Sequence, residues 1–355
     1  MTMTLKIILF EDNEKEVPQL LPALKKTLGR KGNVEQFVSS DNAEKGMYED
    51  RLSKELTSSK YTGAALIVAD RDLSGTGGYM GLSEEIVRRV AYDLGIPECA
   101  YARGERERAF LSIAEKSEAT IAVSVQDPDV FARQVVSIAE GFSAIAEDVP
   151  KVLKASGEKS FGHILAAILG KPEYADKISL YASGDQNRLA SVLAAKGKGG
   201  EGHRRLSCVL GYWLWDSVLR YPGVVVNEVA ASSHLNIYTD AFRNDNLQKL
   251  FRKARYGGPF AEAKGAMWWR GVLDDIVEES GCLDGREYAA KKLKKSVRSS
   301  ECCVDSAKPA GYYCVLSNQP VSLENSRGGL TWLPRGADLA RISSTQYDEH
   351  FPWLE

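Results

Sequence analysis

Two short apolar runs in the first third of the sequence end in acidic residues whose types and spacing could do chemistry. The first run ends in Glu11 and Asp12, and the second ends in Asp70. Apolar runs this short are typical of strands buried in a parallel sheet, and parallel strands bring their carboxyl ends to one edge. Three carboxylates at one edge repel each other, and a hard cation with oxygen ligands relieves that repulsion. The pattern therefore predicts a Mg²⁺ site.

The elements that must position these acids alternate between strand and helix. Such alternation over residues 1–148 predicts an α/β domain with a doubly wound parallel sheet, receiver-like or flavodoxin-like. The predicted strands are residues 6–10, 33–38, 64–70, 97–103 and 119–125. The predicted helices are residues 17–28, 41–56, 82–94 and 129–142. The glycines after Asp70 allow a turn with positive φ, so Asp70 is expected at the carboxyl end of a central strand.

The loop after the central strand carries a family resemblance. A strand that ends in an acidic pair, followed by a strand that ends in Asp70 with Leu73, Ser74 and Gly78 after it, resembles the receiver domain of bacterial response regulators. The resemblance covers only the first predicted domain. It implies that Asp70 accepts a phosphoryl group. It also implies that the acidic pair, Asp70 and the backbone carbonyl of Asp72 hold Mg²⁺.

Two positions depart from the receiver pattern. Members of that family usually carry Thr or Ser at the end of the fourth strand, where this chain has Tyr101, and Lys after the fifth, where it has Gln126 and Asp127. The hydroxyl and the ammonium supply the charge-assisted contacts that detect phosphorylation. Arg103 is a candidate to restore a positive charge from a neighbouring position. The departures predict a receiver fold that serves as a docking platform, with Asp127 repelling a phosphoryl group if it points into the cleft.

Two other interpretations of the acidic residues remain open. Glu11 and Asp12 could cap a helix that begins near residue 15. Asp70 and Asp72 also resemble the Asp-x-Asp motif of haloacid dehalogenase-type phosphatases. In that Mg²⁺-dependent enzyme Asp70 is the nucleophile, Asp72 is the general acid and base, and Asp185 belongs to a second metal-binding segment. The late position of the motif, and the absence of a role for the first acidic pair, favour the receiver and a protein that is not an enzyme.

The rest of the chain matches no family that we recognise from its residues. The polar residues 147–160 predict a domain junction. Residues 160–300 predict a helical output or interaction domain, and residues 301–355 a small β-containing element. The predicted helices there are residues 161–169, 187–195, 206–219 and 223–235. The predicted strands are residues 311–316 and 330–333, with turns at 317–320 and 326–329.

Cysteines crowd into the last quarter of the chain. Four of the six, Cys282, Cys302, Cys303 and Cys314, lie in this part. A Zn²⁺ site is the alternative to reduced thiols. The sequence favours buried thiols, because no Cys-x-x-Cys pair exists and adjacent cysteines seldom both ligate one ion.

Composition limits the class of protein. The chain has 355 residues, of which 44% are hydrophobic and 26% charged, and its net charge is −2. These values are typical of a globular protein and give no reason to expect nucleic acid as a partner. The order of the residues predicts neither a membrane span nor a signal peptide.

Taken together, the sequence leads us to expect a cytoplasmic bacterial signalling protein in a stress or phage-defence pathway. We expect it to bind a protein such as a sensor kinase or related ATPase, or a second copy of itself.

Overall fold

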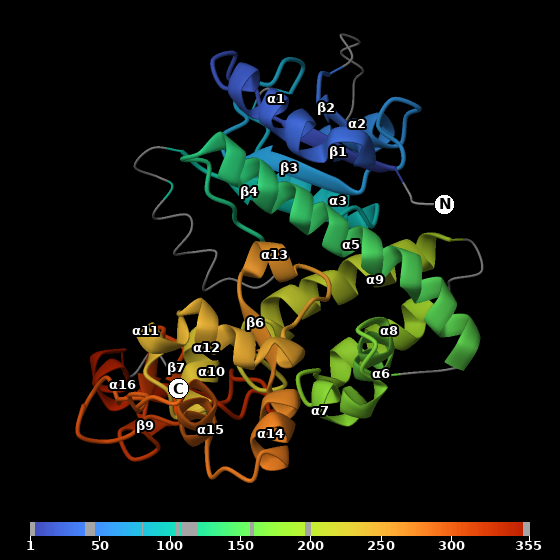
Figure 1. The fold of residues 1–355 in the computed structure, drawn as a ribbon. Coiled ribbons are helices and arrows are strands. Elements are labelled where there is room, and N and C mark those ends of the chain that lie inside the picture. The colour runs from blue at the N-terminus through green and yellow to red at the C-terminus, as the bar shows by residue number, and fades with distance from the viewer. Residues whose placement is uncertain are drawn as a thin grey trace. The chain divides into compact units, whose positions relative to one another are not determined.

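The computed structural model divides the chain into two compact units (Figure 1). It describes residues 4–39, 47–79, 81–103, 107, 120–156, 160–195 and 200–350. Unit 1 consists of Met1–Lys159 together with Arg188–Trp213, and unit 2 consists of Ser160–Asn187 together with Leu214–Glu355. The chain therefore passes between the units three times, and unit 1 is not contiguous in the sequence.

Unit 1 is built on a parallel sheet of four strands. The strands are β1 (Leu5–Phe10), β2 (Gly32–Gln36), β3 (Leu66–Asp70) and β4 (Glu98–Tyr101), in the order β2-β1-β3-β4. Every residue of β3 is buried, as expected for an apolar run in the middle of a parallel sheet. The predicted mixed α/β fold with a parallel sheet is confirmed for these strands.

The predicted fifth strand is reduced to a single bridge in the part of the chain that the structure describes. Ala100 of β4 pairs with Ala122 in parallel. The amide of Ala100 donates to the carbonyl of Ile121 over 2.8 Å, and the amide of Val123 donates to the carbonyl of Ala100 over 3.0 Å. Residues 121–123 thus lie beside β4, and the described residues 120–125 do not form a named strand.

Helices of unit 1 pack on both faces of the sheet. They are α1 (Val17–Leu28), α2 (Tyr48–Leu56), α3 (Glu84–Asp93), α5 (Pro128–Ser156) and α9 (Glu201–Trp213). Side chains alternate between the faces of a strand, and Ile8 and Ile67 share a core with Leu52 of α2 and Val87 of α3. Helices α1 and α5 pack on each other, and α5 also packs on β1 and β3.

Helix α1 coincides with its prediction. Leu20, Leu24 and Leu28 recur at helical spacing and are buried, and Gly29 with φ +54° ends the helix. The amino-terminal part of the predicted helix 41–56 falls on residues 40–46, outside the described residues.

Helix α5 runs through the region that the sequence assigns to a domain junction. The polar residues 147–160 are helical as far as Ser156, with Pro150 inside the helix. Ile145 and Val149 are fully buried and extend the apolar stripe beyond the predicted end at residue 142. Helix α9 packs on α5, and the division between the two units falls between residues 159 and 160, at the end of the predicted junction.

Tyr212 ties α9 to the sheet. Its hydroxyl accepts a hydrogen bond from the amide of Glu98 over 2.7 Å and donates to the carbonyl of the same residue over 2.9 Å. Next to it, a Cβ on Gly211 would lie 2.2 Å from the ring of Phe142, so only glycine allows α9 to approach α5 this closely. Helix α9 is therefore an integral part of unit 1.

The described residues of unit 2 form short helices and two small sheets. Its helices, with α8 shared between the units, are α6 (Phe161–Ile168), α7 (Ala175–Ser179), α8 (Gly184–Ala195), α10 (Glu228–His234), α11 (Thr239–Phe242), α12 (Asp245–Leu250), α13 (Ala261–Lys264), α14 (Arg270–Glu279), α15 (Gly285–Leu293) and α16 (Ser344–His350). Its strands are β5 (Val225–Asn227), β6 (Met267–Trp269), β7 (Tyr312–Cys314), β8 (Gln319–Val321), β9 (Ser326–Arg327) and β10 (Ala340–Ser343).

Several predicted elements of unit 2 need correction. The helix predicted over 223–235 begins only at Glu228, because Val225–Asn227 pairs antiparallel with β6 and the Asn227 side chain caps α10. The helix predicted over 206–219 is an α-helix to Trp213 and a π-helix over Leu214–Val218. Residues 330–333 are not a strand, whereas the predicted turns contain β8 and β9 of a sheet ordered β8-β7-β10-β9.

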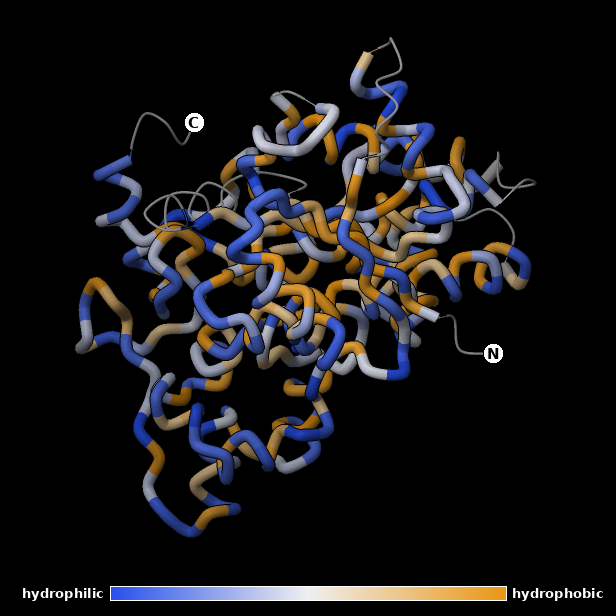
Figure 2. Tube along the Cα trace, turned by 90° about the horizontal axis from the view of Figure 1, so that it is seen from above, coloured by the Kyte–Doolittle hydropathy of each residue, from blue (hydrophilic) through white to orange (hydrophobic). Residues whose placement is uncertain are grey.

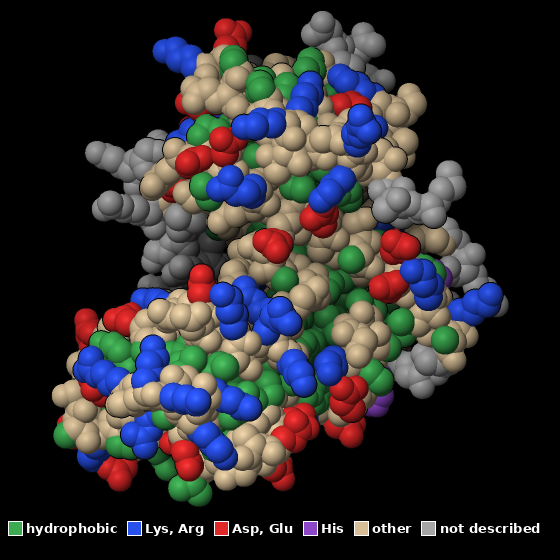
Figure 3. Space-filling view, viewed as in Figure 1, with side chains coloured by type: hydrophobic (Ala, Val, Ile, Leu, Met, Phe, Trp, Pro, Cys, Tyr) green, Lys and Arg blue, Asp and Glu red, His purple; other side chains and the backbone are tan. Residues whose placement is uncertain are grey.

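Apolar and polar residues are mixed along the coloured part of the trace (Figure 2). No helix among the described residues combines the length and the apolar character that crossing a membrane requires. Basic and acidic side chains are likewise interspersed on the face shown in Figure 3, in keeping with a net charge of −2.

Candidate functional site

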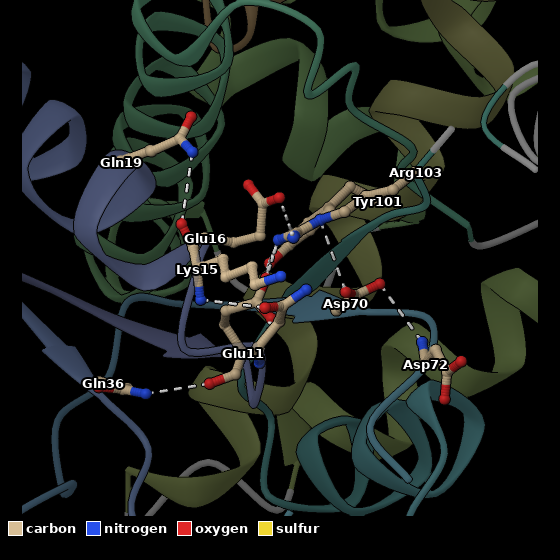
Figure 4. Close-up of polar contacts among 10 residues, drawn as sticks. Glu11, Lys15, Glu16, Gln19, Gln36, Asp70, Asp72, Tyr101 and Arg103 are labelled. Atoms are coloured by element: carbon tan, nitrogen blue, oxygen red, sulfur yellow. Dashed lines mark hydrogen bonds and ion pairs between the residues drawn. The ribbon is translucent and has the colours of Figure 1, made fainter. Parts of the chain in front are cut away.

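The carboxyl ends of β1, β3 and β4 meet at one edge of the unit 1 sheet (Figure 4). Asp70 is the last residue of β3 and pairs with Tyr101, the last residue of β4. Glu11 follows β1 directly, and Arg103 lies two residues beyond β4. The structure thus brings together two of the predicted acids with the two residues that the sequence marks around the fourth strand.

Glu11 uses both carboxylate oxygens within this group. The hydroxyl of Tyr101 donates to its Oε2 over 2.6 Å, and Nη2 of Arg103 donates to the same oxygen. The backbone amide of Asn13 donates to Oε1 over 2.8 Å. The Glu11 side chain is fully buried, so these partners replace the water that a carboxylate needs.

Arg103 contacts three carboxylates through three different nitrogens. Besides its bond to Glu11, its Nη1 lies 3.1 Å from Oε1 of Glu16, and its Nε lies 3.7 Å from Oδ2 of Asp70. Burial lowers the pKa of the guanidinium to about 10, which leaves it protonated at neutral pH. Arg103 therefore restores a positive charge to the edge of the sheet, as the sequence suggests.

Asp70 is buried and only 7% exposed. Burial raises the pKa of Asp70 to about 6, and the negative charges of Asp12 and Asp72 act in the same direction. Hydrogen bonds from the backbone amides of Asp72 and Arg71 oppose that rise in pKa. Asp70 is consequently a carboxyl group that changes its charge close to neutral pH.

The side chains of Asp12 and Asp72 have partners in the loop after β3. Oδ2 of Asp12 accepts from the amide of Gly75 over 2.7 Å and from the hydroxyl of Thr76 over 3.4 Å. Oδ1 of Asp72 accepts from the Ser74 hydroxyl over 2.8 Å. Within the described part of the chain, no three His, Cys, Asp or Glu side chains gather in a way that could hold a metal ion.

Asn13 makes the contacts at the start of α1 that the capping interpretation assigned to Glu11 and Asp12. The side-chain oxygen of Asn13 accepts from the amide of Lys15, and its carbonyl accepts from the amides of Glu16 and Val17. Asn13 therefore organises the start of α1, and Glu11 and Asp12 face the sheet edge and the β3 loop.

Gly78, which matches the loop glycine of receiver domains, is required here by the backbone conformation and by the nearby Ser39. Its φ is +77°, and a Cβ there would lie 2.8 Å from the hydroxyl oxygen of Ser39. Its carbonyl accepts from Nη2 of Arg51 over 2.9 Å. The loop after Asp70 therefore needs a residue without a side chain at this point.

The departures from the receiver pattern have defined positions. Tyr101 is buried, its ring stands edge-on to Phe131 at 5.3 Å, and burial followed by the charge of Asp70 raises the pKa of its hydroxyl well above the usual value. Asp127 caps α5 by accepting from the amides of Asp129 and Val130 over 2.8 and 3.0 Å. Gln126 lies in the bend just before it. Asp127 thus stabilises the start of α5 through these two hydrogen bonds.

The remaining candidates lie in unit 2. Asp185 occupies the first turn of α8. Cys302 and Cys314 pack with Val321 in a small apolar cluster, and all six cysteines are free. Of the other two candidate zinc ligands, Cys303 is exposed and Cys282 is half-buried.

Sequence reasoning missed two contributors to the site. Glu16 stands just before α1 and gives Arg103 a third carboxylate, and Tyr101 donates to Glu11, although the sequence marks it only as a bulky replacement. A signal existed for both, because each lies within a few residues of the carboxyl end of a predicted strand.

No protein-family model matches the chain, and the curated proteins yield no match to it.

Proposed function

We propose that unit 1 is an atypical receiver-like regulatory module that signals by binding a protein partner and does not change conformation when Asp70 is phosphorylated. The observation that supports this proposal is the closed network of Glu11, Tyr101, Arg103 and Asp70 at the sheet edge. Its members come from three strand ends, so it joins the part of the sheet that would have to move in a switch.

A receiver responds when a new phosphoryl group attracts side chains that were elsewhere before. Here the fourth-strand side chain already lies inside, because the Tyr101 hydroxyl is bonded to Glu11 and its ring is buried. The cation also lies inside, because Arg103 contacts Asp70 and two further carboxylates. Few contacts remain for a phosphoryl group to create, so little free energy is available for a conformational change.

The partner that fits this proposal is a protein such as a sensor kinase or a related ATPase, with unit 2 as the output or interaction part. A bacterial stress or phage-defence pathway is the context in which we place it. The phosphatase alternative receives less support, because the carboxylate that would serve as its general acid, that of Asp72, accepts a hydrogen bond from Ser74 of its own loop.

Beryllofluoride tests the proposal directly, since it mimics a phosphoryl group on a carboxylate. We expect hydrogen exchange in α3 and α5 of the full chain to be the same with and without beryllofluoride and MgCl₂. Protection that appears in these helices, and disappears in Asp70→Ala, would identify a working phospho-switch. Hydrolysis of a small aryl phosphate in MgCl₂ by the wild type, but not by Asp70→Ala, would instead favour the phosphatase.

A further inference from the structure

The contacts of Arg103 resemble those of a bound cation more than those of a surface ion pair. Its three guanidinium nitrogens face carboxylates that follow β1, precede α1 and end β3 (Figure 4). Its side chain is 20% exposed, whereas those of Glu11 and Asp70 are 0% and 10% exposed. Ion pairs on the protein surface usually involve two mobile, hydrated side chains, which is not the situation here.

Arg103 brings positive charge to the cluster of Glu11, Glu16 and Asp70, because each of these carboxylates lies within ion-pair distance of its guanidinium. Three carboxylates that share one neighbour would repel each other if no cation lay among them. A guanidinium is always charged and presents its donors in a fixed planar fork, so it can satisfy several carboxylates at once. The Tyr101 hydroxyl adds a neutral donor to Glu11 and completes that carboxylate.

A divalent cation would need the same oxygens. Mg²⁺ prefers octahedral oxygen ligation at about 2.0–2.1 Å and is usually held by one or two carboxylates and several waters. Glu11 and Asp70 both face the guanidinium of Arg103, and Oδ2 of Asp12 accepts from the amide of Gly75. The guanidinium thus lies against the carboxylates that a Mg²⁺ ion would need, so this cluster does not fit Mg²⁺ while Arg103 is present.

We propose that Arg103 is a tethered cation that takes the place of a divalent metal ion, and that loss of its guanidinium opens a Mg²⁺ site at Glu11 and Asp70. The inference rests on the proposed function and deepens it, because it explains how a receiver-like sheet edge is held in one state without an external ion. For the wild-type chain it replaces the expectation of bound Mg²⁺ with the expectation that none binds.

The test is calorimetric titration of MgCl₂ into the full chain, compared between the wild type and Arg103→Met. Methionine keeps an unbranched apolar stem and removes the charge. We expect no saturable binding of Mg²⁺ to the wild type. Arg103→Met should bind one Mg²⁺ with a millimolar Kd. If the wild type shows weak binding, the Kd of the variant should be at least about tenfold lower. The Tm of Arg103→Met should rise in MgCl₂, and that of the wild type should stay constant.

The matched control is Arg89→Met, which removes an exposed guanidinium from α3 that pairs with Glu49 at 2.6 Å. It changes the net charge equally and should bind no Mg²⁺. If Arg103→Met does not fold, Arg103→Gln carries the test, because its amide can still donate to Glu11. If neither variant folds, the wild-type titration decides: saturable binding overturns the proposal, and its absence supports it.

Two results overturn the inference. One is saturable Mg²⁺ binding to the wild type as tight as to the variant, and the other is a folded Arg103 variant that gains no affinity. Either result leaves the proposed function standing if beryllofluoride still has no effect on α3 and α5. Conversely, a beryllofluoride response in a wild type that binds no Mg²⁺ would contradict the proposed function alone.

Discussion

Replacing Tyr212 with phenylalanine is expected to lower the free energy of unfolding of unit 1 by about 2–6 kcal/mol. The Tyr212 hydroxyl satisfies both the amide and the carbonyl of Glu98, over 2.7 and 2.9 Å. Tyr212 is 7% exposed and Glu98 is 0% exposed, so water has poor access to replace the lost bonds. A buried backbone group without a partner costs about 1–3 kcal/mol, and two are affected here.

Urea unfolding and hydrogen exchange together check this prediction. The midpoint should fall in Tyr212→Phe, and the amide of Glu98 should exchange faster. Tyr92→Phe is the matched control, because Tyr92 is 43% exposed on α3 of the same unit and its loss should change stability by less than about 0.5 kcal/mol. Equal midpoints in the two variants would show that the hydroxyl of Tyr212 does not bridge the strand.

The second large effect concerns pH and the side chain of Glu98. Neither oxygen of this carboxyl has a hydrogen-bond partner among the described residues. Burial raises the pKa of Glu98 well above the usual value, and the negative charges of Glu84 and Glu85 raise it further. The positive charge of Arg88 lowers this pKa and offsets part of the rise. Arg88 is already committed, because its Nη1 lies 3.3 Å from Glu84 and donates to Thr120 over 2.9 Å.

The sign of the pH effect follows from the direction of this shift. The folded chain holds a proton on Glu98 that the unfolded chain releases near pH 4.5, the ordinary value. Stability is therefore greatest below that pH and falls as the pH rises toward the folded pKa, by up to about 1.4 kcal/mol per pH unit for one proton. Glu98→Gln carries no proton to release and should remove this part of the slope.

Urea unfolding between pH 4 and pH 8 measures the difference in slope between the wild type and Glu98→Gln. Asp70, whose pKa is raised to about 6, adds a slope of the same sign that remains in the variant. Glu85→Gln is the control, because Glu85 is exposed beside Glu84 and its pKa is lowered, mainly by hydrogen bonds that outweigh burial. Identical slopes for the wild type and Glu98→Gln would show that Glu98 is ionised in the folded chain.

The parts of the fold that follow local patterns are the parts that the sequence predicts. Helix α1 and strands β1 and β3 have a spacing of apolar residues that needs no information from elsewhere in the chain. Strand β5 escaped prediction because its partner β6 lies about 40 residues further on, and only that pairing makes Val225–Asn227 extended.

The candidate site likewise contains residues that the sequence predicts and residues that it does not. Glu11 and Asp70 are predictable because a strand end places them, and the sheet order then brings them to one edge. Their hydrogen-bond partners are not predictable in this way, because Tyr101 and Arg103 lie about 90 residues from Glu11 and the direction of a side chain depends on packing. Hence the sequence identifies the acids and predicts Mg²⁺ beside them, whereas the structure places the guanidinium of Arg103 there.

The position of α9 in the chain affects synthesis on the ribosome. Helix α9 completes unit 1, yet residues 160–187, which belong to unit 2, are translated before it. At about 5–20 residues per second, a nascent chain spends several seconds with β4 made and Tyr212 still missing. During that interval the amide and carbonyl of Glu98 lack their partner, so this edge of the sheet is open to chaperones or to pairing with another nascent chain.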